Sequence, residues 1–320
     1  MKRWLGTIAG WTAAVCLIPS AAAMLWEDKA SDTAARAVTA EMSVTEISGG
    51  IKMLCSSGEI IEMTAEEYAV YAVMGEIPEL ISPEAMKAQV CAARTYAAQR
   101  IAAGTDDATG VHITDDPLKY QTALTPEEAR AVYDDDYDRV YKAVSEAAAA
   151  TKGEIIIYNG KPAIAAFHTA SAGTTETAEN VWGTAVPYLT AVDSPDSSPY
   201  KNIRREFTYA EITARMSAEF GTADAFDGIS VESSPSGTAL SAQLCGNTIS
   251  GDRLARILSL DSAAFTADYD GEKVCFTVNG CGHLAGMSIY GADHMARQGA
   301  DYRSILSHYY PDTDIGCITG

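Results

Sequence analysis

An acid and two cations that lie close together in the chain could carry out acid-base and charge-stabilising chemistry. Glu76 is followed by Lys87 and Arg94, which are seven positions apart. At roughly 100° per residue in a helix, the two cations would project within about 20° of each other and share one face. Such a pair can bind a carboxylate or stabilise negative charge that develops on oxygen. The alternative is a solvated helix edge whose long side chains cover apolar surface.

Two histidines and a tyrosine are further candidates. His168 ends a strand-like segment, His283 lies in a turn flanked by glycine, and Tyr290 follows shortly afterwards. Each histidine could donate a hydrogen bond to a substrate, or it could be a structural residue whose hydrogen bonds are satisfied within the protein. Tyr290 could place its hydroxyl on a ligand or simply pack.

The overall composition limits the class of protein. The chain has 320 residues with 47% hydrophobic content, which is enough for one large domain or two modest ones. Its 23 basic residues stand against 43 acidic ones, and the formal net charge of -20 would repel any polyanion. Nucleic acid is therefore not expected as a partner.

The N-terminus predicts export. Lys2 and Arg3 precede an uncharged stretch over residues 4–26, long enough to cross a hydrocarbon layer of about 30 Å. Residues 1–28 are read as a membrane anchor, with a signal segment cleaved near Ala21–Ala23 as the alternative. Residues 29–50 are read as a linker, since they are rich in Ala, Thr and Ser without a period. In either case the bulk of the chain lies outside the cytoplasm.

The cysteines leave their pairing open. Cys16 lies in the apolar stretch, and the other six allow 15 pairings, so disulfides and buried free thiols are both possible. No C-x-x-C motif occurs and no cysteine has a zinc-like spacing to a histidine, so neither a metal nor another cofactor is expected. These six are Cys55, Cys91, Cys245, Cys275, Cys281 and Cys317.

Two long helices are predicted to position the first candidates. Ser82, Pro83 and Glu84 mark a helix start, and that helix should run to Ala103 and stop at Gly104. A second helix should begin after Pro126, continue through the acidic residues 134–136 and end at Gly153.

Strands and short helices follow. Strands over 154–158 and 161–168 should form a hairpin around Asn159-Gly160, a pair that accepts positive φ angles. Thr208 with Glu211 forms a capping box, and Ser250 or Asp252 should open a short helix that extends through Leu258. Because helices and strands do not alternate strictly, the expected class is α+β, with mixed helices and antiparallel strands.

Several blocks of sequence resemble the stage II sporulation protein D family. The similarity covers roughly residues 60–312, in the family's order, including a middle region near 251–265. The blocks are Gly75-Glu76-Ile77-Pro78, residues 82–89 (SPEAMKAQ), 92–97 (AARTYA), 167–173 (FHTASAG), Glu176-Thr177, Val181-Trp182-Gly183, 186–189 (VPYL), Gly282-His283, Gly286-Met287-Ser288 and Tyr290-Gly291-Ala292.

The resemblance implies a membrane-anchored enzyme that cleaves peptidoglycan glycan strands without hydrolysis, as lytic transglycosylases do. Glu76 matches the family's catalytic glutamate, and Lys87, Arg94, His168 and Tyr290 match positions assigned to its active site. We add His283 to the substrate-binding candidates. The expected domain spans 51–320, with a catalytic core over about 60–200 and 280–312 and a smaller middle subdomain over about 203–278.

The resemblance also implies partners. It places the protein in engulfment during sporulation, alongside other engulfment proteins and an amidase similar to stage II sporulation protein P, which strips stem peptides from the glycan. Some positions depart from the family pattern. Ile289 stands where a glutamine is usual, Leu284 and Ala285 stand in a run usually rich in glycine or valine, and Ala172 replaces a glycine. The cysteines that could bind a metal near His168 in some relatives are absent from this chain, so zinc there is not expected.

Cleavage of a glycosidic bond usually needs two carboxylates, but a transglycosylase can use one. If the 6-hydroxyl of the sugar attacks its own anomeric carbon, one carboxyl group can donate a proton first and accept the hydroxyl proton afterwards. Glu76 is the candidate, since Met74, Ile77 and the rigid Pro78 would favour its protonated form by desolvation.

Three rival functions remain. A zinc amidase is disfavoured because none of the five histidines forms an H-E-x-x-H pair, and a serine hydrolase because no G-x-S-x-G elbow occurs. The third is a catalytically silent peptidoglycan-binding protein that recruits or stimulates an amidase. The departures at Leu284 and Ile289 favour it.

Overall fold

The computed structural model describes residues 44–46, 49–77, 81–116, 120–121, 123–269 and 271–319. They form two compact units. The helical unit comprises the described residues up to Ala166 and from Ala296 onward, and the β-rich unit comprises Phe167–Met295. The predicted anchor over residues 4–26 lies outside the described residues, as does Pro78. Among the described helices, none has the length and apolar character that crossing a bilayer requires.

The helical unit begins with a small sheet and the helix that carries Glu76. Strand β2 (Ile51–Leu54) pairs antiparallel with β3 (Ile60–Met63) and parallel with β4 (Ile113–Thr114). Helix α2 (Ala65–Glu76) follows at once, opened by a capping box between Thr64 and Glu67. Glu76 is thus the last residue of a well-started helix.

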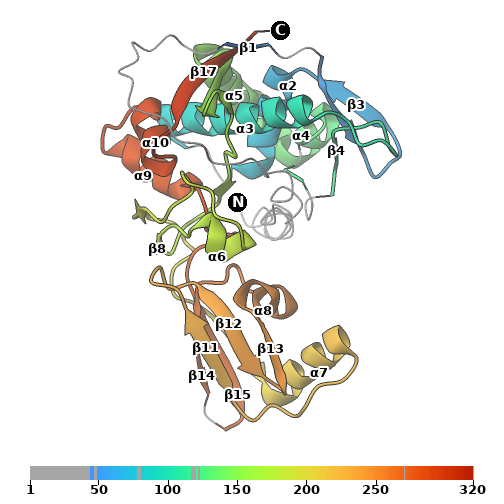
Figure 1. Cartoon of the computed structure of the whole chain (residues 1–320), viewed down its shortest axis with the longest axis vertical. Coiled ribbons are helices and arrows are strands. Elements are labelled where there is room, and N and C mark those ends of the chain that lie inside the picture. Colours follow the sequence, from blue (N-terminus) through green and yellow to red (C-terminus); the bar gives the residue numbers. More distant parts are fainter. Residues whose placement is uncertain are drawn as a thin grey trace. The chain divides into compact units, whose positions relative to one another are not determined.

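Helix α3 (Pro83–Ala103) is the centre of this unit (Figure 1). It begins after Ser82 with Pro83 at its first position and ends at Gly104, which has a φ of 82°, so the predicted bounds are confirmed. It packs against α2, α5 (Tyr137–Ala150), β5 (Glu154–Tyr158) and α10 (Tyr302–Tyr309). Its many buried alanines let these neighbours approach from several sides.

The prediction of one continuous second helix is wrong. The segment forms α4 (Pro126–Tyr133), a short 3-10 turn over Asp134–Asp136, and then α5. Asp134 takes a φ of 46°, which no helix interior tolerates, and the three successive carboxylates repel one another there. Because α4 and α5 do not continue one another, the chain can turn between them.

The predicted hairpin is confirmed at its turn and corrected in its length. Asn159 and Gly160 have φ angles of 50° and 76° between β5 and β6 (Lys161–Pro162). The second strand stops at Pro162, and the alanine-rich stretch that follows has a low preference for strands. Strand β7 (Phe167–His168) belongs instead to the β-rich unit, where it pairs in parallel with β16 (Met287–Ser288).

The sheet of the helical unit is completed from the far end of the chain. Strand β17 (Asp314–Thr319) pairs antiparallel with β5 and parallel with β1 (Val44–Glu46), which gives the order β1-β17-β5-β6. Residues from both ends of the described chain therefore lie in one sheet.

Most of the β-rich unit surrounds its own apolar core. One sheet has the order β10-β15-β14 (Ile203–Thr208, Lys273–Val278, Phe265–Tyr269), and the other has the order β11-β12-β13 (Ile229–Ser233, Ala239–Leu244, Asn247–Ser250). Helices α7 (Tyr209–Phe220) and α8 (Gly251–Leu258) pack with them, and Phe265 and Phe276 are among the buried residues they share. The Thr208–Glu211 capping box is confirmed, and Ser250 is the residue that caps α8.

The remainder of this unit holds short elements. They are β8 (Gly173–Thr174) paired with β9 (Asp193–Ser194), α6 (Ala178–Trp182), and α9 (Ile289–Arg297), which continues from β16. The expected α+β class is confirmed. All six cysteines of the described part are free thiols; Cys91, Cys245 and Cys281 are buried, and the other three are partly exposed.

Candidate active-site residues

Glu76 lies at the C-terminal end of α2 and is largely buried. Its exposed fraction is 9%, and its neighbours Met74 and Ile77 are buried. The helix ends there because Ile77 is extended, with φ and ψ of -75° and 124°. The hydroxyl group of Tyr133 donates to the Met74 carbonyl at 2.5 Å and anchors this end to α4. Glu76 is therefore buried at a fixed helix end, and its catalytic role stays a prediction.

Arg94 is wholly buried and bonded within the helical unit. Its guanidinium donates to the Glu66 carboxylate at 2.7 Å and to the Glu154 carbonyl at 2.9 Å, with Thr151 Oγ1 at 3.4 Å. It thereby joins α2, α3, α5 and β5. Because the side chain has no exposed surface, its visible role is structural, and direct contact with a substrate stays a prediction.

Lys87 is partly exposed and has partners of its own. Its ammonium group lies 2.6 Å from Glu84 Oε1 and 5.7 Å from the ring centroid of Tyr302. The hydrogen bond from Lys87 is the main cause that lowers the pKa of Glu84, and a bond from the Tyr302 amide adds to it. Since Tyr302 also donates to Glu154, Lys87 and Arg94 face the same neighbourhood, as their spacing predicts.

His168 and His283 lie together in the β-rich unit. Their ring centroids are 5.7 Å apart, and Trp182 lies 5.3 Å from His283. His168 Nδ1 is 3.1 Å from the Ala285 carbonyl, while the Ala285 amide donates to His283 Nδ1 at 3.1 Å. The backbone of Ala285 thus holds both rings.

Burial keeps both imidazoles neutral. It lowers the pKa of His168 to about 3 and that of His283 to about 4. Since a carbonyl only accepts, His168 Nδ1 carries the proton and Nε2 is left with a lone pair. In the described part of the chain this buried Nε2 has no hydrogen-bond partner. Near pH 7 it is therefore a hydrogen-bond acceptor rather than an acid.

The loop before β16 shows what the departures from the family pattern do. Leu284 is buried with a φ of 67°, between Gly282 at 105° and Gly286 at 69°. A bulky residue is strained in this region, so the surrounding packing must hold it there. Ile289 is also buried, which places an apolar side chain in the interior.

Tyr290 begins α9 beside the β7–β16 pair. Its amide donates to the Thr169 carbonyl at 3.1 Å, and its ring meets that of Tyr200 edge-on at 6.3 Å. The structure therefore brings His168, His283 and Tyr290 into one region of the β-rich unit. Glu76, Lys87 and Arg94 belong to the helical unit, and a joint active site of the two sets stays a prediction.

Glu176 has a role that the sequence did not assign. It is 1% exposed, accepts hydrogen bonds from the Thr177 amide at 2.7 Å and from Ser234 Oγ at 2.5 Å, and donates its amide to the Leu284 carbonyl. It fixes the loop that carries His283. The only sign of this role in the sequence was that Glu176 belongs to the Glu176-Thr177 block. Among the described residues, no group of three His, Cys, Asp or Glu side chains is arranged to hold a metal ion.

Comparison with known proteins gives one consistent family. The family model described as "Stage II sporulation protein" matches residues 56–158. The chain is 34% identical over 253 residues to "Stage II sporulation protein D" of Bacillus subtilis (strain 168), covering 78% of this chain and 74% of that protein. The protein of the same name in Bacillus amyloliquefaciens is 32% identical over 280 residues, covering 86% and 81%. An "Amidase enhancer" of Bacillus subtilis (strain 168) is 24% identical, covering 76% of this chain and 39% of that protein.

Proposed function

Because this chain belongs to the stage II sporulation protein D family, we propose that it is a lytic transglycosylase that cleaves peptidoglycan glycan strands during sporulation engulfment. The observation that carries the proposal is the burial of Glu76, the residue that matches the family's catalytic glutamate, at the end of α2. Burial in general disfavours the charged form of a carboxyl group, and a general acid must carry its proton when the substrate binds.

In the proposed reaction Glu76 acts twice. It first protonates the glycosidic oxygen as the bond to the anomeric carbon breaks. The 6-hydroxyl of the same muramic acid then attacks that carbon, and Glu76 takes the hydroxyl proton back. The products are a 1,6-anhydro-muramic acid end and a new free end, and no water is consumed.

The other candidates are proposed to bind the glycan. Lys87 keeps part of its side chain exposed and can exchange Glu84 for a substrate carboxylate. His168 offers the Nε2 lone pair to a sugar hydroxyl, with His283 and Tyr290 beside it. Arg94, buried as it is, would act mainly through the residues that it holds in place.

The substitution E76Q tests this proposal. We expect it to abolish release of anhydro-muropeptides from purified glycan, because an amide can neither donate nor accept the required proton, while glycan binding is kept. E127Q is the matched control, since Glu127 is an exposed acid at the start of α4. Mass spectrometry of the digests measures the product, and anhydro ends formed by E76Q at the wild-type rate would remove the assignment.

A second candidate function is that of a non-catalytic protein that assists an amidase. Similarity to an amidase enhancer, with the strained Leu284 and the apolar Ile289, fits a glycan-binding protein that recruits or stimulates an amidase. The test adds this protein to a purified cell-wall amidase and follows both product classes. Faster peptide release together with glycan binding and no anhydro ends would establish this second function.

Attachment to the outer face of a membrane is also proposed, on the basis of Lys2, Arg3 and the uncharged stretch over residues 4–26. Fractionation of cells that express the whole chain, compared with a chain lacking residues 1–28, tests it. The whole chain should remain with washed membranes, and recovery of both chains in the soluble fraction would overturn the anchor.

A further inference from the structure

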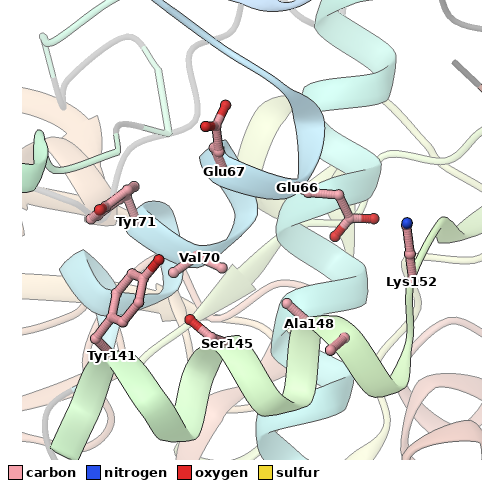
Figure 2. A pocket seen from close by; sticks show the side chains of 9 residues that line it. Glu66, Glu67, Val70, Tyr71, Tyr141, Ser145, Ala148 and Lys152 are labelled. Carbon is pink, nitrogen blue, oxygen red and sulfur yellow. The ribbon is translucent and has the colours of Figure 1, made fainter. Parts of the chain in front are cut away.

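A cavity opens in the helical unit, and Glu76 is not among the residues that line it. It has a volume of about 240 Å³ and lies between α2 and α5 (Figure 2). Its residues on α2 begin at Glu66, ten positions before Glu76, which corresponds to about 15 Å along a helix. The lining residues are Glu66, Glu67, Val70, Tyr71, Tyr141, Ser145, Ala148, Ala149 and Lys152.

One side of the cavity is an aromatic wall. The rings of Tyr71 and Tyr141 have centroids 6.0 Å apart, and Tyr137 stacks on Tyr141 at 5.5 Å. Tyr141 is 38% exposed, which makes it one of the few large apolar side chains at the surface of the described residues. Ring faces of this kind attract the polarised C–H groups of a pyranose, which carries hydroxyls at its edge. The wall therefore suits the C–H face of a sugar ring, and it also suits a cation, which is the competing occupant considered below.

The opposite side carries a carboxylate that is held in place. Glu66 accepts from Arg94 at 2.7 Å and from the Gly153 amide at 2.9 Å, and a third of its side chain remains exposed. Arg94 offsets its charge, so the free lone pairs are oriented acceptors for hydroxyl or amide hydrogens. Arg94 thus acts on this cavity through Glu66.

Two further groups complete the polar lining. Lys152 is exposed at the end of α5, and Figure 2 shows its ammonium group on the same side as the Glu66 carboxylate. Among the described residues, the Lys152 ammonium group forms no ion pair. Figure 2 also shows the Ser145 hydroxyl directed towards Val70 and Tyr141, and that hydroxyl oxygen has no partner among the described residues.

From these features we propose that the α2–α5 cavity is an accessory subsite for one muramic acid unit of a glycan strand stripped of stem peptides. The proposal rests on the proposed function and extends it. The pyranose stacks on Tyr141, its hydroxyl or acetamide groups bond to Glu66, and its lactyl carboxylate pairs with Lys152. With a volume of about 240 Å³, the cavity has room for one sugar ring, and the rest of the strand would lie outside it.

The free lactyl carboxylate explains the choice of sugar. Only a stripped strand carries it, since an attached stem peptide converts the carboxylate into a neutral amide. The cation at Lys152 then distinguishes stripped muramic acid from both its peptide-bearing form and N-acetylglucosamine. A basic peptide segment is the competing occupant, and it would use the Glu66 and Glu67 carboxylates instead.

Calorimetric titration of the intact protein with amidase-stripped glycan tests the subsite, with Y141A and K152Q as variants. We expect Y141A to weaken binding roughly 5- to 10-fold. K152Q should weaken binding of stripped glycan but leave binding of N-acetylglucosamine oligomers unchanged. The matched control is Y269A, because Tyr269 is an exposed tyrosine of the β-rich unit. Thermal unfolding of each variant confirms that it is folded.

The outcomes separate this subsite from the catalytic proposal. Stripped glycan that binds Y141A and K152Q as tightly as wild type would overturn the subsite, and so would a basic peptide that competes for Tyr141 while glycan does not. Weakened glycan binding by these variants would support the subsite even if the wild-type protein formed no anhydro ends, a result that would overturn only the proposed cleavage. Loss of cleavage in E76Q with unchanged binding would support the catalytic proposal, and only weaker binding by Y141A and K152Q would support the subsite.

Discussion

At the scale of single residues, the two buried imidazoles play opposite roles in hydrogen bonds to the backbone of one residue. His168 donates to the Ala285 carbonyl, and His283 accepts from the Ala285 amide. Protonation of His283 would place a proton against that amide, and protonation of His168 would bury a charge. The pair is therefore suited to hold a loop as two neutral rings, with His168 Nε2 able to accept a hydrogen bond but not to take up a proton near neutral pH.

Acid should destabilise the protein through this pair. Burial lowers the pKa of His168 to about 3 and that of His283 to about 4, below the ordinary value of 6.5. At a pH between the folded and unfolded pKa values, the unfolded chain therefore binds more protons than the folded chain. Stability is thus complete above pH 6.5 and falls as the pH drops. We expect a loss of about 1–3 kcal/mol between pH 6.5 and 5, measured by urea unfolding. H168N should reduce this dependence and H294N should not, and equal pH slopes for the two variants would contradict the account.

Arg94 should be far more sensitive to a conservative change than an exposed arginine. R94K should lower the free energy of unfolding by about 2–4 kcal/mol, because a lysine cannot reach the Glu66, Glu154 and Thr151 acceptors together. R139K is the control, since Arg139 forms an exposed ion pair with Asp136 and its change should cost less than about 0.5 kcal/mol. Denaturant titration measures both, and equal values would show that the buried network is not structural.

At the scale of elements, two glycines are needed for different reasons, one for its backbone conformation and the other for lack of space. Gly160 has a φ of 76° in the β5–β6 turn, and an added Cβ would meet nothing within 4 Å. Gly251 begins α8, and an added Cβ would lie 1.9 Å from the Ala239 carbonyl oxygen. At position 160 only the backbone conformation disfavours a larger residue, whereas at position 251 a side chain would clash with the neighbouring strand.

The two alanine variants should therefore differ. G160A should cost about 1 kcal/mol through the left-handed backbone, and G251A about 2–3 kcal/mol because α8 must move away from β12. Unfolding monitored by circular dichroism compares them. A G251A variant as stable as wild type would show that α8 can shift freely.

The elements also show which features the sequence could predict. The bounds of α3, the Asn159-Gly160 turn and the Thr208–Glu211 cap follow from a few adjacent residues, so local reasoning found them. The end of β6 at Pro162 and the break at Asp134 also have local causes, in the alanine-rich stretch after Pro162 and the three adjacent carboxylates, but the longer strand and helix patterns masked them.

The same division holds for the candidate site. The spacing of Lys87 and Arg94 predicted a shared face, but complete burial of Arg94 comes from α2, α5 and β5, which lie far away in the sequence. The contact between His168 and His283 joins residues more than one hundred positions apart, and no periodicity predicts it.

At the scale of the whole molecule, the chain leaves the helical unit after Ala166 and returns to it at Ala296. Within the β-rich unit, the segment over residues 203–278 begins and ends on paired strands, since Ile203 is opposite Val278. Its apolar core is built from its own residues, including Phe265 and Phe276. Its ends are therefore already adjacent.

That segment should fold when it is produced alone. It exceeds the length of about 60 residues at which many domains fold independently, and its ends need no bridging loop. We expect dispersed amide signals in a nitrogen-proton correlation spectrum and one cooperative urea transition. The control is a fragment that stops before β14 and β15. A collapsed spectrum for the 203–278 fragment would mean that its core depends on the rest of the chain.

The six described cysteines carry free thiols, and burial raises the pKa of Cys91 to about 11. Almost none of that thiol is a thiolate at neutral pH, so it reacts slowly with oxidants and with other disulfides. The described fold consequently reaches its final form without any oxidative maturation. A reducing agent should therefore leave the folding yield of this part of the chain unchanged.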